Sequence, residues 1–582
     1  MLLACAGVFF ACGPLGCTAP APSEPTSGDL AGEPEAKVKV PAPSALQERL
    51  AALDPIRPLP PSDAQRQLTG LMDGYFSRSN EKRIYLSVDK PLYHPGESVW
   101  FRAWDLATPT LTSQQSGWVL AQLITPRGSV LIQRQLQLRA GVASSDFAIP
   151  PGTAGGEYKL AVTVAGAAKS ERTILVSSYQ PPRIKKKLEL LRKAYGPGDK
   201  VAAAVSLAGA TGEALAGKKA TYLAVVDGVE IARKTFVTGE KGNAVVRFEL
   251  PRRIARGDGL LTILIEDGGV TESIQKRIPI ITGQIDLALY PEGGDLVFGL
   301  PGRVYFAAKN PLGKPADIEG RVVTDDGREV ATFRSLINGM GRFELTPAAN
   351  TAYHVEIARP VGVTATYPLP TVKESGCSLM AVDDFAGNRD EVRTAIWCSE
   401  AREVIVTASL RDRRLGDVAA KIARGVPSVV AIPVPPGRQG AVRVTLFNDQ
   451  GGLSPLAERL IYRGLGDDLH VAITADRERY TPRAPITLTV ATTDGAGRPV
   501  DADLALSVVD DTVLSFADDK SANMLAAVYL EGEMPGQKIY HPNDYFAGTP
   551  EAVHGLDLVL GTQGWRRFDW QHAFAPPPPP MP

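Results

Sequence analysis

YLSVDKPLYHPGESVWFRAW, residues 85–104, alternates apolar and polar side chains on both sides of a turn that carries Tyr93, Pro95 and Gly96. Alternation with a period of two predicts a β-strand on each side, with one face in a core and the other in water. Proline fixes φ and glycine tolerates positive φ, so the pair closes a tight turn. Tyrosine adds an apolar ring and one hydroxyl for the turn backbone. The stretch therefore predicts two strands joined by an ordered turn.

Related turns recur along the chain, the first after roughly 100 residues. After the first three of these turns, a glycine precedes an alternating strand that ends at proline. Units of about 100 residues with some seven short strands are typical of β-sandwiches of the immunoglobulin or fibronectin type. The later turns are YGPG at 195–198, LPG at 300–302 and YTPR at 480–483, and the glycine strands are GVASSDFAIPP (141–151), GNAVVRFELP (242–251) and GRFELTP (341–347).

The chain of 582 residues is too long for one hydrophobic core, because a single core stops growing near roughly 250–300 residues. Its glycine, its proline and its short runs of valine, isoleucine and threonine favour an all-β protein of tandem antiparallel β-sandwiches. We expect a signal at 1–17, a proline-rich tether with short helices at 18–80, five sandwiches at 81–178, 179–283, 284–370, 371–464 and 465–572, and a proline-rich tail at 573–582.

The first 17 residues, MLLACAGVFFACGPLGC, form an apolar run that ends in small residues and a cysteine. This pattern is typical of a bacterial lipoprotein signal and predicts lipidation of Cys17. No lysine or arginine precedes the run, and Pro14 stands where leucine is usual. Cys5, which follows LLA, is a second candidate for lipidation if the true start lies upstream. A buried N-terminal helix is the alternative to a signal. The run is too short to span a bilayer. It predicts export to the cell envelope, as a periplasmic or surface-exposed outer-membrane lipoprotein, or secretion.

Export permits disulfides. Of the five cysteines only Cys377 and Cys398 lie outside the signal, and we predict that they pair across neighbouring strands; two buried free thiols are the alternative. The net charge of −1 gives no basic field for phosphates, so nucleic acid is not an expected partner.

The stretch VDKPLYHPGESVWFRAW (88–104) resembles the signature of macroglobulin-like domains in the alpha-2-macroglobulin and complement family. Further stretches resemble bacterial members, namely LYPEGGDLVFGLPGRVYFAA (289–308), LALSVVDDTVLSF (504–516) and TQGWRRFDW (562–570). The resemblance implies tandem macroglobulin-like sandwiches and a protein that inhibits endopeptidases. The signature residues, to which it gives a structural role, are Asp89, Lys90, Tyr93, Pro95, Gly96 and Arg102.

The sequence departs from that family in one chemical respect. Many members carry a C-G-E-Q thioester motif, and the nearest stretch here, WCSEA at 397–401, lacks both the glycine and the glutamine. The helical domain that carries the motif is also missing, so we expect the front half of a longer protein or a shortened paralogue. The six histidines are scattered, and no zinc, P-loop or nucleophile-elbow motif occurs. We therefore expect no enzyme, no cofactor and no metal.

The segment 515–562 loses the alternating pattern and predicts a long loop with a helical turn or two. Long loops in compact domains are usually functional or disordered. In the family, a bait region that proteases cut is inserted at the corresponding place. The alternatives are an ordinary packed insertion, or a bait that begins in the tail. The candidate cleavage residues are Lys520, Met524, Tyr529, Lys538 and Tyr540.

Two functions follow as hypotheses. The first is an envelope-anchored protease trap that works without a thioester, with endopeptidases as partners and the membrane reached through the lipid. The second is a structural or adhesive scaffold of the cell envelope, in which exposed sheet edges bind a protein partner.

Overall fold

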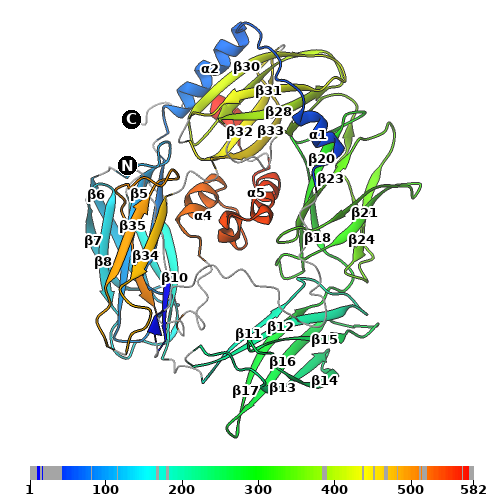
Figure 1. The fold of residues 1–582 in the computed structure, drawn as a ribbon. Helices are drawn as coiled ribbons and strands as arrows, with labels where there is room; N and C mark the ends of the chain where they lie inside the picture. The colour runs from blue at the N-terminus through cyan, green and yellow to red at the C-terminus, as the bar shows by residue number, and fades with distance from the viewer. Residues whose placement is uncertain are drawn as a thin grey trace.

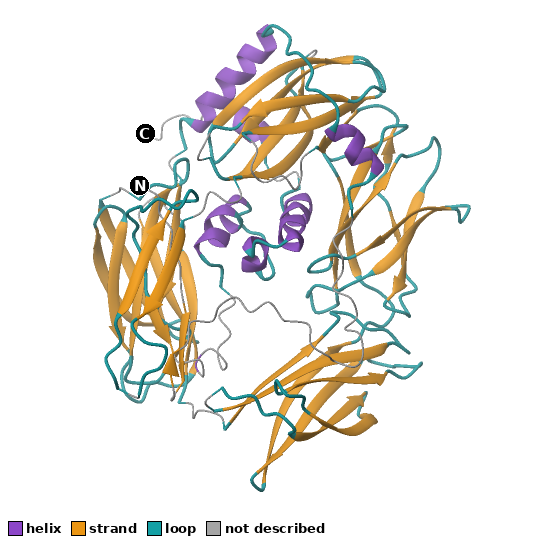
Figure 2. Cartoon of the chain, in the orientation of Figure 1, coloured by secondary structure: helices purple, strands orange, loops and turns teal. Residues whose placement is uncertain are grey.

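The computed structural model describes residues 9–13, 16–17, 42–79, 81–113, 116–164, 169–178, 183–210, 212–382, 390–435, 438–449, 452–464, 469–481, 483–509, 513, 521–565 and 568–575. Within these ranges β-sandwiches follow one another around a ring, and a group of helices lies in its middle (Figures 1 and 2). The separate sheets, nearly all antiparallel, confirm the all-β class of tandem sandwiches that the sequence predicts.

The first two sandwiches share one plan, a three-stranded sheet packed on a larger sheet. Along β13 (Lys219–Val226) buried and more exposed residues alternate, as expected of a strand with one face in a core. The first sandwich has the sheets β3-β5-β8 and β4-β10-β9-β6-β7, with β3 (Lys82–Val88), β4 (Leu92–Tyr93), β5 (Ser98–Ala107), β6 (Gly117–Ile124), β7 (Val130–Leu138), β8 (Val142–Ala148), β9 (Gly156–Val164) and β10 (Ser170–Val176). The second has β11-β12-β15 and β14-β13-β16-β17, with β11 (Ile184–Leu190), β12 (Lys200–Gly209), β14 (Val229–Val237), β15 (Asn243–Glu249), β16 (Asp258–Asp267) and β17 (Val270–Pro279).

The third sandwich repeats this plan and adds a short two-stranded sheet, β19-β26. Its main sheets are β18-β20-β23 and β22-β21-β24-β25. The strands are β18 (Asp286–Pro291), β19 (Leu296–Val297), β20 (Gly302–Lys309), β21 (Glu319–Thr324), β22 (Glu329–Arg334), β23 (Met340–Leu345), β24 (Tyr353–Arg359), β25 (Thr366–Pro368) and β26 (Val372–Lys373).

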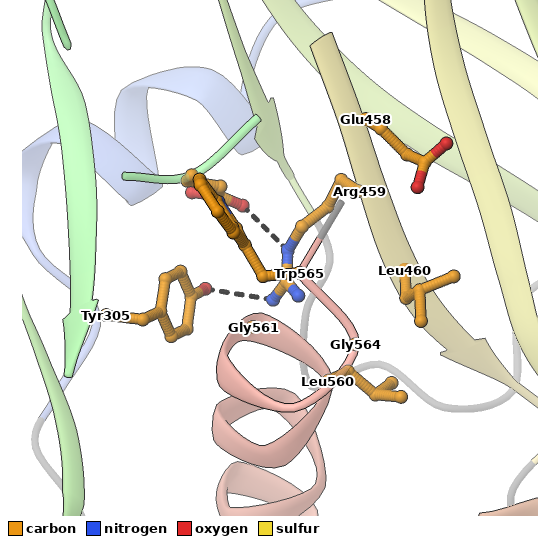
Figure 3. Close-up of a pocket in the computed structure, with 9 residues that line it drawn as sticks. Tyr305, Glu458, Arg459, Leu460, Leu560, Gly561, Gly564 and Trp565 are labelled. Atoms are coloured by element: carbon orange, nitrogen blue, oxygen red, sulfur yellow. Dashed lines mark hydrogen bonds and ion pairs between the residues drawn. The ribbon is translucent and has the colours of Figure 1, made fainter. Parts of the chain in front are cut away.

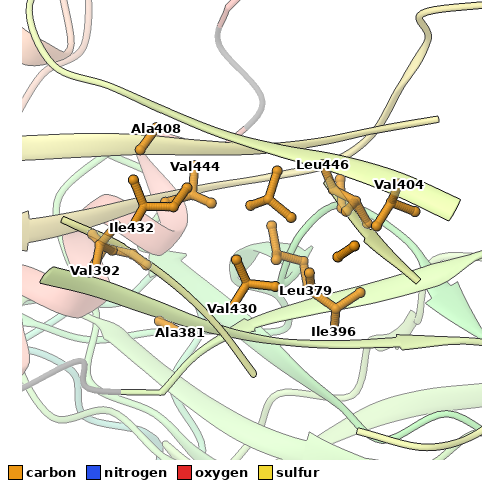
Figure 4. Close-up of a cluster of buried hydrophobic side chains, with 14 of the residues drawn as sticks. Leu379, Ala381, Val392, Ile396, Val404, Ala408, Val430, Ile432, Val444 and Leu446 are labelled. Carbon is orange, nitrogen blue, oxygen red and sulfur yellow. The ribbon is translucent and has the colours of Figure 1, made fainter. Parts of the chain in front are cut away.

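The fourth sandwich has the sheets β27-β28-β31 and β30-β29-β32-β33, whose facing aliphatic side chains form the core drawn in Figure 4. Cys377 and Cys398 stand opposite each other on β27 and β28 and form a disulfide with an S–S distance of 2.01 Å. The strands are β27 (Cys377–Ala381), β28 (Glu391–Cys398), β29 (Arg402–Ser409), β30 (Arg414–Ile422), β31 (Ser428–Pro433), β32 (Gly440–Asn448) and β33 (Pro455–Arg463).

Two helices precede the first sandwich, as expected, and both pack on later parts of the chain. Helix α1 (Ala45–Ala51) begins at the N-cap Ser44 and buries Leu50 in a cluster with residues of the third and fourth sandwiches. Helix α2 (Asp63–Phe76) begins at the N-cap Ser62 and lies on β30 (Figure 1). In the described part of the chain, no helix has the length and apolar character that crossing a membrane requires.

The fifth unit differs from the sandwich predicted at 465–572. Its described strands are β34 (His470–Ala475), β35 (Leu488–Thr493) and β36 (Ser507–Val509), and β36 pairs with β1 (Phe9–Gly13), which also pairs with β2 (Gly16–Cys17). The described chain from 521 onward is mostly helical, because the N-caps Asn523 and Thr549 favour helix over strand. The helices are α4 (Met524–Tyr529), η1 (Glu531–Glu533), η2 (Pro542–Phe546), α5 (Pro550–Thr562) and α6 (Trp570–Phe574).

The core of the fourth sandwich gives a first prediction. Leu446 has no exposed surface and packs between the two sheets, so Leu446→Ala should lower the free energy of unfolding by about 3 kcal/mol. Hydrogen exchange of the β29 and β32 amides measures this loss. The matched change Leu312→Ala, at a side chain that is 74% exposed, should leave the exchange rates unaltered. Equal protection in both variants would show that Leu446 contributes no packing energy.

Candidate functional site

The Tyr93 turn is held by its own side chains. Tyr93 is fully buried; its hydroxyl donates to Asp89 Oδ1 at 2.6 Å and accepts the Lys90 N–H at 3.3 Å. The same carboxylate oxygen accepts the Trp100 N–H at 2.9 Å, so it joins the end of β3 to the start of β5. Burial raises the pKa of Tyr93 far above its usual value. Burial also raises the pKa of Asp89, against the opposing effect of the hydrogen bonds from Tyr93 and Trp100.

Lys90 and Glu97 close the other side of the turn. The Lys90 ammonium lies 2.7 Å from Glu97 Oε2 and 5.1 Å from the centre of the Tyr93 ring. Burial alone would raise the pKa of Glu97, but the Lys90 ammonium and the His94 N–H outweigh it and hold that pKa below its usual range. Gly96 has a φ of +95°, which other residues rarely adopt.

Arg102, the last of the signature residues, forms an ion pair outside this turn. Its guanidinium forms an ion pair with Asp503 of the fifth unit and lies 5.4 Å from the centre of the Trp104 ring. Asp503 is distant in sequence, so this contact could not be read from the local pattern. The residue connects two units of the ring.

The turn at Tyr480 repeats the hydrogen bonds of the Tyr93 turn. The Tyr480 hydroxyl donates to Asp476 and accepts the Arg477 N–H at 2.9 Å, and the Thr487 N–H donates to Asp476 Oδ1 at 2.9 Å. In the second sandwich leucine stands where these turns have aspartate, and the Tyr195 hydroxyl donates instead to the Ala202 carbonyl at 3.3 Å. The recurring tyrosines therefore have one structural role.

The helices in the middle of the ring form the candidate functional site. Residues 521–562, the central helical unit, comprise α4, η1, η2 and α5 and lie between the first, third and fourth sandwiches (Figure 1). Leu556, Val559 and Leu560 of α5 are buried against residues of the third and fourth sandwiches. Gly561 passes so close to Tyr305 that a Cβ would lie 2.5 Å from the ring. This unit is therefore packed, and only part of its surface is exposed.

Asp557, buried in the middle of α5, binds arginines from two sandwiches. Arg459 of β33 pairs with one carboxylate oxygen, and Arg342 of β23 lies 2.9 Å from the other. The Tyr305 hydroxyl donates to the same carboxylate at 3.1 Å, and burial raises the pKa of that hydroxyl. We call these four residues the Asp557 clamp.

Arg459 extends the Asp557 clamp to a second buried carboxylate. Its Nε lies 3.1 Å from Glu292 Oε1, and its Nη2 donates to the Tyr305 hydroxyl at 3.0 Å (Figure 3). Arg303 donates to both carboxylate oxygens of Glu292, from Nε to Oε2 at 2.5 Å and from Nη2 to Oε1 at 2.9 Å. Charges taken out of water cost several kcal/mol each unless they are paired in this way. The network therefore favours one relative position of α5 and the two sandwiches.

Glu533 forms a second clamp, between the first and fourth sandwiches. Its Oε1 lies 3.0 Å from Arg83 Nη1 and 3.5 Å from Arg411 Nη1. Gly532 and Gly440 make room for the two guanidiniums, since a Cβ at either position would meet an arginine nitrogen within 2.8 Å. We call Glu533, Arg83 and Arg411 the Glu533 clamp. Because Arg411 is buried, its pKa is lowered, although the nearby Glu533 opposes this.

The cleavage candidates take different positions. Met524 is buried against the first sandwich and Tyr529 is half-buried, with Arg411 over its ring. Lys538 is exposed on the link between η1 and η2, and the hydroxyl of the half-buried Tyr540 donates to the Gly313 carbonyl. Lys520 lies outside the described residues. Residues 521–562 of the predicted long loop thus form a packed helical unit with two exposed links, one that carries Lys538 and one at 547–549.

The sequence did not reveal the two clamps. Their members come from strands and helices that lie hundreds of residues apart, as with Arg83 and Glu533. One signal was available: Asp557 interrupts the apolar second half of α5, and a charge among buried apolar residues needs a partner. Of the two lipidation candidates, Cys17 is described by its backbone alone, as part of β2, and Cys5 lies outside the described residues. Among the described residues, no group of three histidines, cysteines or acids could hold a metal ion.

No protein-family model matches this sequence. An alpha-2-macroglobulin of Ralstonia nicotianae is 21% identical over 490 residues, which are 75% of this chain and 30% of that protein. The chain is a relative of alpha-2-macroglobulin. It spans less than a third of that relative's length. The resemblance to macroglobulin-like domains is thereby confirmed.

Solved structures of bacterial alpha-2-macroglobulins are also similar to this chain. One is the trypsin-activated alpha-2-macroglobulin of Escherichia coli, with 14% identity and a TM-score of 0.43. The matched region is 71% of this chain and 33% of the Escherichia coli chain. Another is the native conformation of the Escherichia coli protein, with 14% identity and a TM-score of 0.36. The matched region is 80% of this chain and 34% of the Escherichia coli chain.

The Tyr93 turn gives a second prediction. Tyr93→Phe keeps the buried ring but removes the hydroxyl between Asp89 and the Lys90 N–H, so the first sandwich should lose about 1–3 kcal/mol of stability. Hydrogen exchange of the β3 and β5 amides measures the loss. Tyr93→Ala, which also empties the ring's site, should cost more, about 3–5 kcal/mol. If Tyr93→Phe exchanges like the wild type, the hydroxyl does not hold the turn.

The Asp557 clamp gives a third prediction. Asp557→Ala leaves Arg459 and Arg342 without their carboxylate, so the docking of α5 should weaken by about 3–5 kcal/mol. The amides of α5 and β33 should then exchange faster while the core of the second sandwich is unaffected. Asp544→Ala, at an exposed acid of the same unit, is the matched control. Unchanged exchange in α5 would mean that packing alone holds the helix.

Proposed function

We propose that this chain acts as a protease trap, which a protease triggers by cutting the central helical unit. The observation that carries the proposal is that one helical unit holds the first, third and fourth sandwiches through two separate buried clamps. Kinship to alpha-2-macroglobulin supports the protein class. We propose noncovalent, steric capture, in which the sandwiches enclose the protease.

The proposed cut follows Lys538. The exposed link that carries this residue separates η1, with the Glu533 clamp, from α5, with the Asp557 clamp. A cut there would leave α4 and η1 bound to the first and fourth sandwiches, through the Glu533 clamp, and α5 bound to the third and fourth sandwiches, through the Asp557 clamp. Ile539, which follows, is buried, so a protease must first draw the link outward. Lys520 is a second proposed site.

Relaxation after the cut has a physical cause. The first sandwich touches the central helical unit through Arg83 and through Arg172, which donates to the Ala522 carbonyl at 3.2 Å. While the link is intact, these contacts and the Asp557 clamp belong to one rigid unit. After the cut the two halves are no longer joined by the chain, so the first sandwich, held by the Glu533 clamp, can move relative to the third, held by the Asp557 clamp, around the bound protease. Large substrates would then be excluded from it and small ones admitted.

We further propose that the chain is exported and anchored in the cell envelope. The signal pattern at 1–17 and the proline-rich residues after it support a lipid on Cys17 as the anchor. Endopeptidases that reach the envelope are then its partners. Mass spectrometry of the membrane fraction after expression of the full chain tests the lipid directly.

A titration with trypsin, which cuts after lysine and arginine, tests the trap. We expect the first cut after Lys538, a change in the radius of gyration by small-angle scattering, and a loss of activity toward a large protein substrate but not toward a small peptide. Lys538→Gln should delay the cut and the scattering change, whereas Lys241→Gln, at an exposed lysine of the second sandwich, should alter neither. If cleavage after Lys538 leaves the large-substrate activity intact, the chain is not a trap.

A further inference from the structure

The link between η1 and η2, residues 534–541, is exposed at Lys538 but held on both sides of it. Before Lys538, the Gln537 N–H donates to the Met534 carbonyl at 3.2 Å and closes a turn. After it, Ile539 is only 8% exposed and lies in the apolar cluster that α5 forms with the third and fourth sandwiches. A protease that recognises the Lys538 side chain therefore meets a link that is packed next to the bond it would cut.

Tyr540 ties this link to the third sandwich. Its hydroxyl donates to the Gly313 carbonyl, and its own carbonyl accepts a hydrogen bond from Asn338 Nδ2 at 3.2 Å. The Lys538 ammonium lies 5.1 Å from the centre of its ring. The next residue, His541, has a φ of +49°, which is uncommon for residues other than glycine. Contacts with the third sandwich, more than local backbone preference, therefore hold this end of the link.

Asn338 is buried, and its carboxamide is bonded on both sides. Its Oδ1 accepts from the Lys193 ammonium of the second sandwich at 2.6 Å, and its Nδ2 also donates to the Tyr545 hydroxyl at 3.1 Å. An ammonium can only donate and the Tyr540 carbonyl can only accept, so these two neighbours fix the amide in one orientation. One side chain thus joins the second sandwich, the third sandwich and the central helical unit.

These contacts decide how the link can be cut. Proteases cut folded proteins through locally opened states, and when opening is fast the rate follows the population of the open state. To present the bond after Lys538, the chain must withdraw Ile539 from its cluster and break both hydrogen bonds of Tyr540 to the third sandwich. The strength of those bonds therefore sets how often the link is open.

We propose that Asn338 is the latch of this link: its hydrogen bond to the Tyr540 carbonyl keeps the link closed and sets the rate at which a protease cuts after Lys538. Asn338 is a positioning residue, because it acts on the cut bond through Tyr540. The inference rests on the proposed cut after Lys538 and adds how that cut is controlled.

A first test compares the full chain with a free peptide, EMPGQKIYHPN, which copies residues 533–543. Trypsin hydrolyses the bond after the single lysine of the peptide without any opening step. At the same trypsin concentration, the full chain should be cut after Lys538 more slowly than the peptide by about a hundredfold or more, as followed by mass spectrometry. Equal rates would overturn the proposal, because the link would then be open in the folded chain.

Asn338→Asp is the variant that tests the latch. Asparagine 338 has a φ of +50°, and aspartate tolerates this backbone conformation as well. The carboxylate still accepts from Lys193 and from the Tyr545 hydroxyl, but it opposes the Tyr540 carbonyl, to which it cannot donate. The cut after Lys538 should be about tenfold faster or more, since a buried carbonyl loses its donor.

Lys193→Met is the matched control, because it removes the bond on the other side of the same carboxamide and leaves the bond to Tyr540. Its cut should stay within about threefold of the wild type. Hydrogen exchange of residues 534–541 should rise in Asn338→Asp alone, whereas the α5 amides and the cut after the exposed Lys241 should be unaltered in both variants.

Three results would overturn the latch. One is an unchanged rate of cutting in Asn338→Asp, and another is an equal increase in both variants. The third is faster exchange throughout α5, or faster cutting after Lys241, in Asn338→Asp, which would show that Asn338 holds more of the fold than the link.

The activity of the bound protease separates this inference from the trap. If Asn338→Asp is cut faster but the protease keeps its activity toward a large substrate, the latch stands and the trap fails. If Asn338→Asp is cut at the wild-type rate and the activity toward a large substrate is lost, the trap stands and the latch fails.

Discussion

The pairing of Arg459 with Asp557 and Glu292 is the interaction on which the rest of the ring depends. It joins the fourth sandwich, helix α5 and the third sandwich through one guanidinium that is almost completely buried. Buried charges give little net stability compared with an apolar core, but they penalise every arrangement in which a partner is missing. The network therefore specifies where the central helical unit sits more than it adds to the stability of any one sandwich.

The sandwiches themselves need no such network. Each has its own apolar core, and in the first and second sandwiches a buried tyrosine hydroxyl also binds the backbone of a turn. The second sandwich shows that the aspartate can be replaced, because the Tyr195 hydroxyl donates to a carbonyl of β12 instead. Modules that fold locally can be repeated along a chain, and their relative positions are then free to be set by a few contacts.

The central helical unit supplies such contacts between sandwiches. Its two clamps share the fourth sandwich and differ in the other: Glu533 pairs with arginines of the first and fourth, and Asp557 pairs with arginines of the third and fourth. A link that carries Lys538 runs between them. While this link is intact, it keeps the two clamped halves of the unit at a fixed distance from each other. The proposed function therefore depends on where the chain can be cut. The candidates Met524 and Tyr529 fit this role less well, because packing protects them.

The sequence by itself determined the repeated β-sandwich, the tyrosine turns and the pairing of Cys377 with Cys398, because alternation, Pro-Gly turns and residue types act over short distances. It also predicted kinship to alpha-2-macroglobulin from residues 88–104. It did not predict the ion pair of Arg102 with Asp503 or the helices at 524–562, and it gave no sign of the Glu533 clamp. These features arise between units whose members lie far apart in sequence, such as Arg83 and Glu533, and only the packing of the folded ring brings them within hydrogen-bonding distance.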